Sequence, residues 1–233
     1  DLGGSLTLID AVEAICRAVP AHIRVRLGSL EPRTITPEFC RRAAALPNLC
    51  PHFHLSMQSG CDTVLARMNR KYDSARYYES VKLLNEAYEA PGITTDLIVG
   101  FPGETEEEFQ QTLAFIRRCA FSAMHIFPYS RRPGTPADGM PGQILNSVKE
   151  ERAHRAQQTA LEMEAAYLDR WVGQTVPVLF EEERDGLWRG HTTRYSEVAA
   201  PSGEALHNQL RQVRITGRTG NILCGELYEE PKN

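Results

Sequence analysis

Residues 93–119, ITTDLIVGFPGETEEEFQQTLAFIRRC, contain the pattern that decides the fold of this chain. A β-rich run from Ile93 ends in a turn at Gly100, and a helical pattern follows from Glu106 to Cys119. Thr105 is followed three positions later by a glutamate, which is the capping box that satisfies unpaired amides at a helix start. The segment is therefore predicted to be a strand, a tight turn and a capped helix.

The same alternation extends to both sides of this segment. Further β-rich runs begin near Ile23, Phe53 and Met124, and helical patterns cover residues 5–18, 37–46 and 74–89. Strands and helices in alternation predict repeated βα units on a parallel sheet. Because the chain opens on a helix with no strand before it, we expect a fragment of a larger barrel.

The pattern changes in the last third of the chain. A turn-rich stretch at residues 132–142 leads into a long polar helix predicted over 143–170. Residues 171–233 form short alternating segments separated by glycines, which is typical of a small closed β-barrel. The predicted fold class is α/β: a partial parallel barrel over 1–142, a connecting helix over 143–170, and a small all-β barrel over 171–233.

Composition limits the classes of function. The chain is 42% hydrophobic and 24% charged, as globular proteins are, and no apolar run approaches the roughly 20 residues of a membrane-spanning helix. The six cysteines are spaced irregularly, so we expect reduced thiols and no locally built metal or iron–sulfur site. With a net charge of -4, any RNA contact must be a local basic patch.

Loops at the ends of parallel strands meet at one edge of the sheet, so chemistry is expected there. Four such loops are polar and carry glycine, which predicts a cofactor pocket lined by residues 28–32, 58–62, 100–105 and 129–135. The plainer alternative for the third loop is a tight turn with no ligand. His52 and His54 face one side of a strand without a third ligand, so they are predicted to be hydrogen-bonded interior residues, not a metal site.

Five blocks carry a family resemblance: RLGSLEP at 26–32, CPHFHLSMQSGCD at 50–62, RMNRKY at 67–72, TTDLIVGFPGET at 94–105 and FPYSRRPGT at 127–135. In this order they resemble the radical S-adenosylmethionine (radical SAM) methylthiotransferases. The first two blocks are most similar to the branch that modifies threonylcarbamoyladenosine in tRNA. The resemblance spans essentially the whole chain.

The resemblance implies four of the six strands of a radical SAM barrel, followed by a TRAM RNA-binding domain. It implies S-adenosyl-L-methionine as cofactor and tRNA as partner, for a cytoplasmic enzyme that adds a methylthio group beside the anticodon. The full-length parent would hold two four-iron clusters (4Fe-4S) on cysteines that are absent here. This fragment is therefore predicted to hold no cluster, to have no catalytic residue of its own and to be inactive alone.

The resemblance also assigns individual residues. Those similar to the positions that hold the ribose and methionyl ends of the cofactor are Gln58, Ser59 and Arg67, and those similar to the adenine-binding wall are Gly100, Phe101, Phe127 and Tyr129. The basic candidates for phosphate contact in the small barrel are Arg189, His191, Arg194, Arg211 and Arg214. Two alternatives stay open: a non-catalytic RNA-binding module, and the branch that modifies a ribosomal protein.

Overall fold

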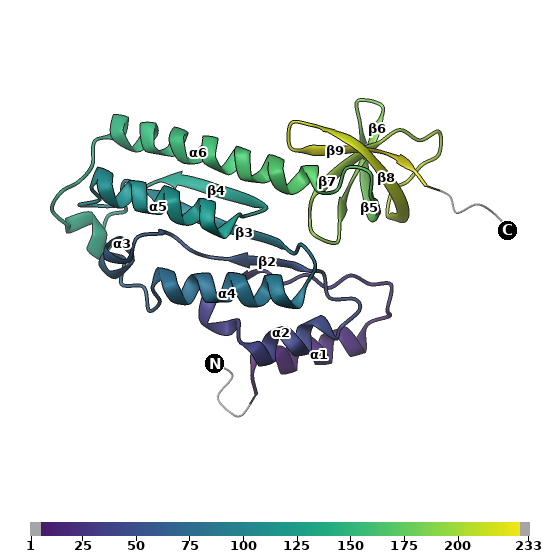
Figure 1. Ribbon diagram of the computed structural model, residues 1–233, viewed down its shortest axis with the longest axis horizontal. Helices are drawn as coiled ribbons and strands as arrows, with labels where there is room; N and C mark the ends of the chain where they lie inside the picture. The colour runs from purple at the N-terminus through teal and green to yellow at the C-terminus, as the bar shows by residue number, and fades with distance from the viewer. Residues whose placement is uncertain (1–5, 229–233) are drawn as a thin grey trace.

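The computed structural model describes residues 6–228 as two units joined by one long helix (Figure 1). The larger unit is built on a parallel sheet whose strands lie in chain order. They are β1 (Ser29–Leu30), β2 (His52–Leu55), β3 (Gly92–Val99) and β4 (Ala123–Pro128). This confirms an α/β unit with a four-stranded parallel sheet, which is consistent with part of a radical SAM barrel.

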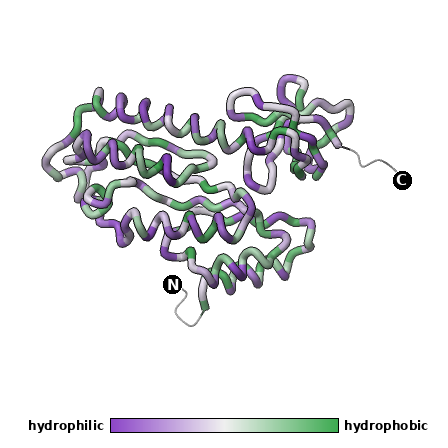
Figure 2. Tube along the Cα trace, viewed as in Figure 1, coloured by the Kyte–Doolittle hydropathy of each residue, from purple (hydrophilic) through white to green (hydrophobic). Residues whose placement is uncertain are grey.

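Helices pack on one face of this sheet. They are α1 (Leu8–Ala18), α2 (Pro37–Ala44), α3 (Asp62–Arg67), α4 (Ser74–Ala87), α5 (Glu106–Cys119) and α6 (Asn146–Asp169), with short 3-10 turns at Pro32–Thr34 and Pro136–Gly139. The core between the helices and the sheet includes Phe53 and Leu97 from the strands and Tyr77, Phe109 and Ile116 from the helices. Figure 2 shows the alternation of hydrophobic and hydrophilic residues along these elements. No helix of residues 6–228 covers the opposite face of the sheet, which is the surface on which the candidate site lies.

The capping box predicted before α5 is present. The Thr105 hydroxyl accepts from the Glu108 backbone N–H at 3.2 Å, and the Glu108 carboxylate accepts from the Thr105 N–H at 2.9 Å. The helix ends at Cys119, because the next residue, Ala120, has a left-handed φ of 53° that stops further helical pairing. The strand–turn–helix segment thus folds as its local pattern predicts.

The first strand does not form in the predicted run at 23–27 but at 29–30, and a register change separates the two. Val25 makes one isolated parallel bridge to Leu49, whereas in β1 Ser29 pairs with His54, so the β2 side gains one residue between the two pairs. Pro51 lies in that interval and has no N–H to give to a ladder. The pairing is therefore interrupted: the run at 23–27 makes only the isolated bridge at Val25, and the two-residue strand forms after it, at 29–30.

The small unit confirms the predicted closed β-barrel. Its strands are β5 (Thr175–Arg184), β6 (Leu187–Thr192), β7 (Glu197–Ala200), β8 (Gln209–Thr219) and β9 (Ile222–Leu227), closed in the order β5-β6-β7-β9-β8. Glycine is required where strands approach closely: a Cβ at Gly190 would collide with the backbone of Leu179 on the neighbouring strand. Phe180 and Val213 fill the interior.

Helix α6 connects the two units and contributes to both cores. Ala156 and Ala160 lie in the core of the larger unit, while Tyr167 and Leu168 in the last turn pack into the small barrel. The Tyr167 hydroxyl donates to the carbonyl of Ala90 at 3.1 Å, which fixes this end of the helix beside the start of β3. None of the described helices is long and apolar enough to cross a membrane.

Candidate functional site

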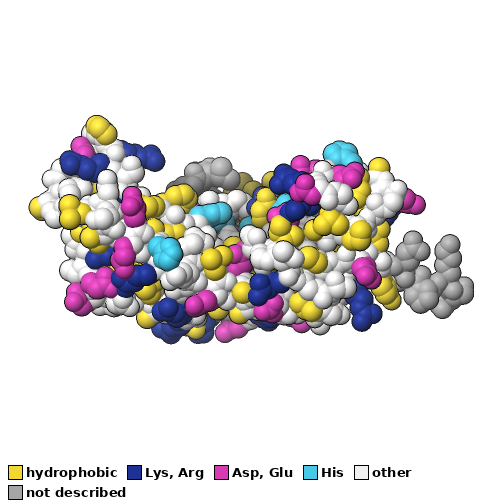
Figure 3. Space-filling view, turned by 90° about the horizontal axis from the view of Figure 1, so that it is seen from above, with side chains coloured by type: hydrophobic (Ala, Val, Ile, Leu, Met, Phe, Trp, Pro, Cys, Tyr) yellow, Lys and Arg dark blue, Asp and Glu magenta, His cyan; other side chains and the backbone are white. Residues whose placement is uncertain are grey.

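The uncovered inner face of the sheet is polar. Side chains alternate across a strand, and the residues of β2, β3 and β4 turned away from the helices include His52, His54, Thr94, Asp96 and His125. A filled parallel barrel places bulky aliphatic residues inside instead. Figure 3 shows the surface hollowed between two raised parts, with histidine side chains at the hollow. This face is built for contact with a polar ligand.

One pocket lies where β2, β3 and β4 end, and we call it the carboxyl-edge pocket. It has a volume of 590 Å³ and is lined by Gln58, Asp96, Ile98, Phe127, Pro128, Tyr129, Ser130, Arg132, Thr135 and Ala137. This volume lies in the range of small-molecule sites, about 300–1,000 Å³. Three of the seven predicted cofactor residues, Gln58, Phe127 and Tyr129, therefore share one pocket.

The pocket combines an apolar wall with constrained polar groups. Phe127 is a large aromatic residue that is 52% exposed, so its ring is available to a ligand. Gln58 adopts a left-handed φ of 69°, fixed by backbone hydrogen bonds of 2.9 Å to Asp96 and from Ile98. The buried Tyr129 hydroxyl has no partner among the described residues. Unusual backbone and unsatisfied polar atoms of this kind concentrate at functional sites.

Two predicted cofactor residues lie behind the pocket wall. Ser59 is 1% exposed, and its hydroxyl accepts from the N–H of Cys61 at 3.2 Å and lies 3.3 Å from the hydroxyl of Thr112. Phe101 is 7% exposed and packs edge-on against the Tyr129 ring, with centroids 5.3 Å apart. Both residues support the pocket and neither lines it.

Arg67 binds a carboxylate through both terminal nitrogens of its guanidinium, but that carboxylate belongs to the protein itself. Its guanidinium donates to the two oxygens of Glu108 at 2.9 and 2.6 Å. This hydrogen bonding holds the pKa of Glu108 down, at about 2. Because Glu108 also caps α5, Arg67 joins α3 to the start of α5.

The loop after β3 is pinned to α6. Gly100 has a φ of +71°, and a Cβ there would collide with the Cγ of Lys149, so only glycine fits. The Lys149 ammonium donates to the carbonyl of Tyr129 at 2.9 Å. One turn further on, Arg152 donates to the Glu104 carboxylate at 2.8 Å, with both side chains no more than 5% exposed. Burial outweighs this pairing and raises the pKa of Glu104 above its ordinary value.

The predicted basic residues of the small barrel divide into two groups. Arg189 pairs with Glu197 at 2.8 Å, and His191 stacks on Tyr195 with centroids 4.5 Å apart. The Arg194 guanidinium donates to the carbonyls of residues 89 and 90 and lies over a tryptophan ring, so it holds the two units together. Arg211 and Arg214 on β8 are exposed and are the members of the set open to a phosphate.

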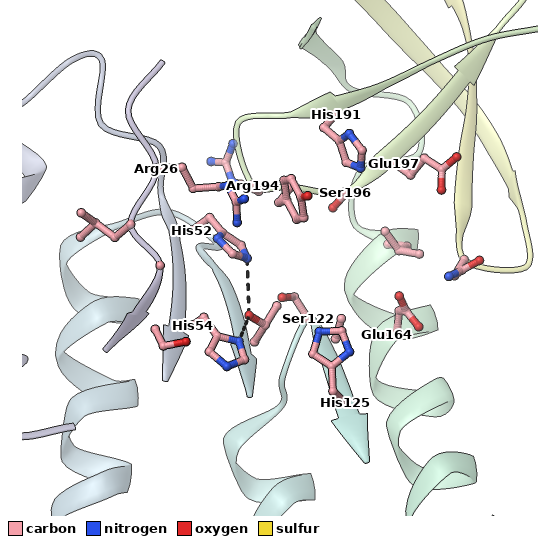
Figure 4. Close-up of a pocket in the computed structure, with 18 residues that line it drawn as sticks. Arg26, His52, His54, Ser122, His125, Glu164, His191, Arg194, Ser196 and Glu197 are labelled. Carbon is pink, nitrogen blue, oxygen red and sulfur yellow. Dashed lines mark hydrogen bonds between the residues drawn. The ribbon is translucent and has the colours of Figure 1, made fainter. Parts of the chain in front are cut away.

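A second pocket, which sequence reasoning did not find, lies between the two units, and we call it the interdomain cavity (Figure 4). It has a volume of 420 Å³, and its polar lining includes His52, His54, His125, Glu164, Arg194 and Tyr195. Burial, followed by the charge of Arg26, lowers the pKa of His52 to about 4, so this imidazole is neutral at pH 7. Within residues 6–228 no three His, Cys, Asp or Glu side chains are placed to hold a metal ion. The sequence carried two signals for it, the histidines alternating at 52 and 54 and the polar loop at 28–32. Gly28 and Ser29 of that loop line this cavity and not the carboxyl-edge pocket for which the loop was predicted.

Comparison with known proteins agrees with this architecture. The radical SAM superfamily matches residues 3–116. The threonylcarbamoyladenosine tRNA methylthiotransferase MtaB of Bacillus subtilis is 36% identical over 197 residues, which cover 82% of this chain and 44% of that protein. MtaB of Thermotoga maritima is 41% identical, over 78% of this chain and 41% of the relative. The tRNA-2-methylthio-N(6)-dimethylallyladenosine synthase of Symbiobacterium thermophilum is 36% identical, and the match covers 98% of this chain and 49% of that protein.

The chain thus spans about half the length of the curated relatives it matches, between 41% and 49% for these three. Among solved structures, the radical SAM enzyme coproporphyrinogen III oxidase (HemN) of Escherichia coli superposes with a TM-score of 0.55. That match covers 68% of this chain and 38% of the oxidase at 15% identity, so it bears on the fold alone. Sequence relatives, the superfamily match and the parallel sheet lead to one conclusion: the chain belongs to the radical SAM methylthiotransferase family.

Proposed function

We propose that this chain is part of a cytoplasmic tRNA methylthiotransferase that adds a methylthio group to threonylcarbamoyladenosine beside the anticodon. The observation that carries the proposal is the carboxyl-edge pocket, where Gln58, Phe127 and Tyr129 converge from two strand ends in a chain with methylthiotransferase relatives. Both MtaB relatives are named for this substrate, which supports the choice of branch.

S-adenosyl-L-methionine is the proposed ligand of this pocket. The exposed Phe127 ring and the neighbouring Ile98 offer an apolar wall on which an adenine ring can stack. Gln58 supplies a polar contact, and Arg132 suits the carboxylate of the methionyl end. When bound with its iron–sulfur cluster, the cofactor supplies the radical chemistry, while these residues bind and orient it.

The cysteines in the described residues do not fit an iron–sulfur cluster. Five of the six are buried, and no three cluster-forming side chains of residues 6–228 come together. Burial raises the pKa of Cys40 to about 11 and of Cys119 to about 12, which disfavours the thiolate that binds iron. We propose that both 4Fe-4S clusters are held by other parts of the parent protein and that this chain alone has no turnover.

The small barrel is proposed to act as a TRAM domain that contacts tRNA. Arg211 and Arg214 stand exposed on β8 and supply the positive charge, while Arg189 is paired with a carboxylate and Arg194 is engaged with the larger unit. Seven basic against nine acidic residues over 171–233 give the barrel no strong overall attraction for phosphate. RNA binding by this part of the protein should therefore be weak and local.

Equilibrium dialysis of this chain against radiolabelled S-adenosylmethionine tests the pocket. We expect weak binding, and Phe127→Ala should reduce it at least about fivefold because stacking on a base is worth about 1–3 kcal/mol. Leu161→Ala is a matched control, since Leu161 is 51% exposed and lies on α6 away from the pocket. If the wild type and both variants bind S-adenosylmethionine with equal affinity, the carboxyl-edge pocket is not its binding site.

Substrate choice is tested with the intact parent enzyme. Its reconstituted form should methylthiolate tRNA carrying threonylcarbamoyladenosine and should not modify tRNA carrying dimethylallyladenosine or a ribosomal protein, as read by mass spectrometry. A methylthio group found on dimethylallyladenosine instead would assign the activity for which the Symbiobacterium thermophilum relative is named. Deoxyadenosine formed by the isolated chain after iron reconstitution would contradict its predicted inactivity.

A further inference from the structure

A third pocket lies where helix α6 begins, and we call it the α6 pocket. It has a volume of 440 Å³ and is lined by Pro128, Tyr129, Ser130, Arg131, Asn146, Lys149 and Glu150. Pro128, Tyr129 and Ser130 also line the carboxyl-edge pocket, so the two pockets adjoin at the end of β4. The cofactor proposed for the carboxyl-edge pocket leaves the α6 pocket without an occupant.

Lys149 brings a positive charge into the wall of the α6 pocket without a carboxylate to balance it. Its side chain is buried, with 7% of the residue exposed. Its contacts within residues 6–228 are neutral: the ammonium donates to the carbonyl of Tyr129 at 2.9 Å and lies 5.7 Å from the centroid of the Tyr129 ring. An ammonium has three protons to donate, and a buried charge without a counter-ion is unfavourable. An anionic ligand in the pocket offsets that cost.

The start of α6 adds backbone donors to the same pocket. Leu145 precedes the helix and has no side-chain oxygen to cap it, and the first turn contains no acidic residue. The N–H of Val148 donates to the carbonyl of Leu145, whereas the N–H groups of Asn146 and Ser147 have no acceptor among the described residues. Free amides at a helix start carry partial positive charge and favour anions. Because Asn146 lines the pocket together with Lys149, both contributions act on one ligand.

The rest of the polar lining is consistent with a ligand that carries charged oxygens. Ser130 and Asn146 can donate hydrogen bonds from their side chains. Arg131 donates to Asp138 at 2.9 Å, so its charge is partly offset. Glu150 is the one carboxylate of the lining, but it is exposed, so water screens its charge more than that of buried Lys149. The pocket therefore favours a phosphate group.

We propose that the α6 pocket binds a backbone phosphate of the RNA substrate. This inference rests on the proposed function, which makes RNA the partner and places the cofactor in the adjoining carboxyl-edge pocket. An RNA whose target base reaches that cofactor carries its flanking phosphates past the end of β4, where the α6 pocket lies. Phosphate contacts fix the register of a nucleic acid and carry no sequence information. The pocket thus positions the target base without selecting it.

NMR of this chain labelled with nitrogen-15 tests the anion site with inorganic phosphate as the probe. The backbone amide signals of Asn146 and Ser147 should shift and saturate with phosphate and should not do so with chloride at the same ionic strength. An anticodon stem–loop RNA should shift the same two signals. Equal responses to phosphate and chloride overturn the site. If phosphate shifts the signals and RNA does not, the pocket binds a free ion only, and the proposal is wrong.

Fluorescence anisotropy of the labelled stem–loop tests the charge of the pocket in both directions. Asn146→Asp should weaken RNA binding about fivefold, the size of a Coulomb interaction between close unit charges near a surface. It should not lower the unfolding temperature, because a carboxylate at a helix start is favourable. Glu150→Gln removes the exposed carboxylate of the lining and should tighten binding about twofold. Gln158→Glu is the matched control, since Gln158 is exposed on α6 about 18 Å beyond Asn146.

Lys149 has a readout of its own. Lys149→Met should reduce the salt slope of RNA binding by about one, as the loss of one phosphate contact does. A folded Lys149→Met variant with the slope of the wild type contradicts the contact. If this variant does not fold, Asn146→Asp and Glu150→Gln decide, because neither removes a hydrogen bond that the structure contains.

The outcomes separate this inference from the proposed function. If the wild type binds no RNA, the proposed RNA partner and this inference fail together. If RNA binds and Asn146→Asp weakens it no more than Gln158→Glu does, the RNA partner stands and the α6 pocket is not its phosphate site. Tighter binding by Glu150→Gln supports the proposal, and weaker binding by that folded variant contradicts it.

Discussion

The ion pair between Glu104 and Arg152 offers a sharp test of how the loop after β3 is held. Both side chains are almost completely buried, with 3% and 5% of their surface exposed, and the arginine donates to a carboxylate oxygen and to the backbone carbonyl of Glu104. The carboxylate also accepts from the Gly100 N–H at 3.2 Å. Arg152→Met keeps an unbranched apolar stem and removes both donated hydrogen bonds and the charge.

We expect this change to lower the free energy of unfolding by about 3–5 kcal/mol, because it leaves a buried carboxylate without its cation. That is a large share of the roughly 5–15 kcal/mol that stabilises a typical protein. Arg155→Met is the matched control on the same helix: it pairs with Glu106 and Glu151, all three are partly exposed, and exposed pairs contribute about 0–1 kcal/mol. Urea unfolding followed by circular dichroism at 222 nm measures both variants.

The effect of Arg152→Met should depend on pH, and its sign follows from Glu104. Burial already raises the pKa of this carboxyl above 4.5, and removal of the arginine takes away an influence that lowers it. A raised folded pKa means that stability is greatest below the ordinary value and is lost as pH rises through the folded pKa. The variant should therefore be less impaired near pH 4.5 than at pH 8. Equal losses for Arg152→Met and Arg155→Met, or a loss independent of pH, would refute the reasoning.

Three further predictions concern the junction of the two units and the small barrel. Gly92→Ala should destabilise the protein by more than 1 kcal/mol in calorimetry, because a Cβ there would collide with the Arg194 carbonyl, whereas Gly28→Ala meets nothing within 4 Å and should be neutral. Arg194→Ala removes two interdomain hydrogen bonds and the cation over the Trp171 ring. We expect the free energy of unfolding to fall by about 1–3 kcal/mol and the tryptophan fluorescence to change. Unchanged fluorescence would argue that Arg194 does not hold the two units together. Arg214→Ala should weaken RNA binding equally across sequences and reduce the salt slope by about one, and a slope equal to that of the wild type would exclude a phosphate contact.

Local pattern was sufficient for the elements with strong periodicity. Helix α5 begins and ends at the predicted residues because Thr105, Glu108 and the apolar spacing all act within a few positions of one another. The small closed barrel followed from glycine-separated alternating segments. The first strand differed: it forms at 29–30 and not in the run 23–27, because the pairing with the β2 segment changes register near Pro51, and no property of residues 23–27 records that change.

The site divides in the same way. The sequence determined the chemistry of each side chain and predicted that polar strand ends share a pocket; Gln58, Phe127 and Tyr129 line one pocket in the structure, whereas the loop at 28–32 lies at the other. Only the tertiary structure decided the partners: Glu108 for Arg67, the backbone before β3 for Arg194, and the walls of the interdomain cavity. Hydrogen bonds and ion pairs act over a few ångströms in space, whereas these partners are separated by about 40 to more than 100 positions in the chain, so no local pattern specifies them.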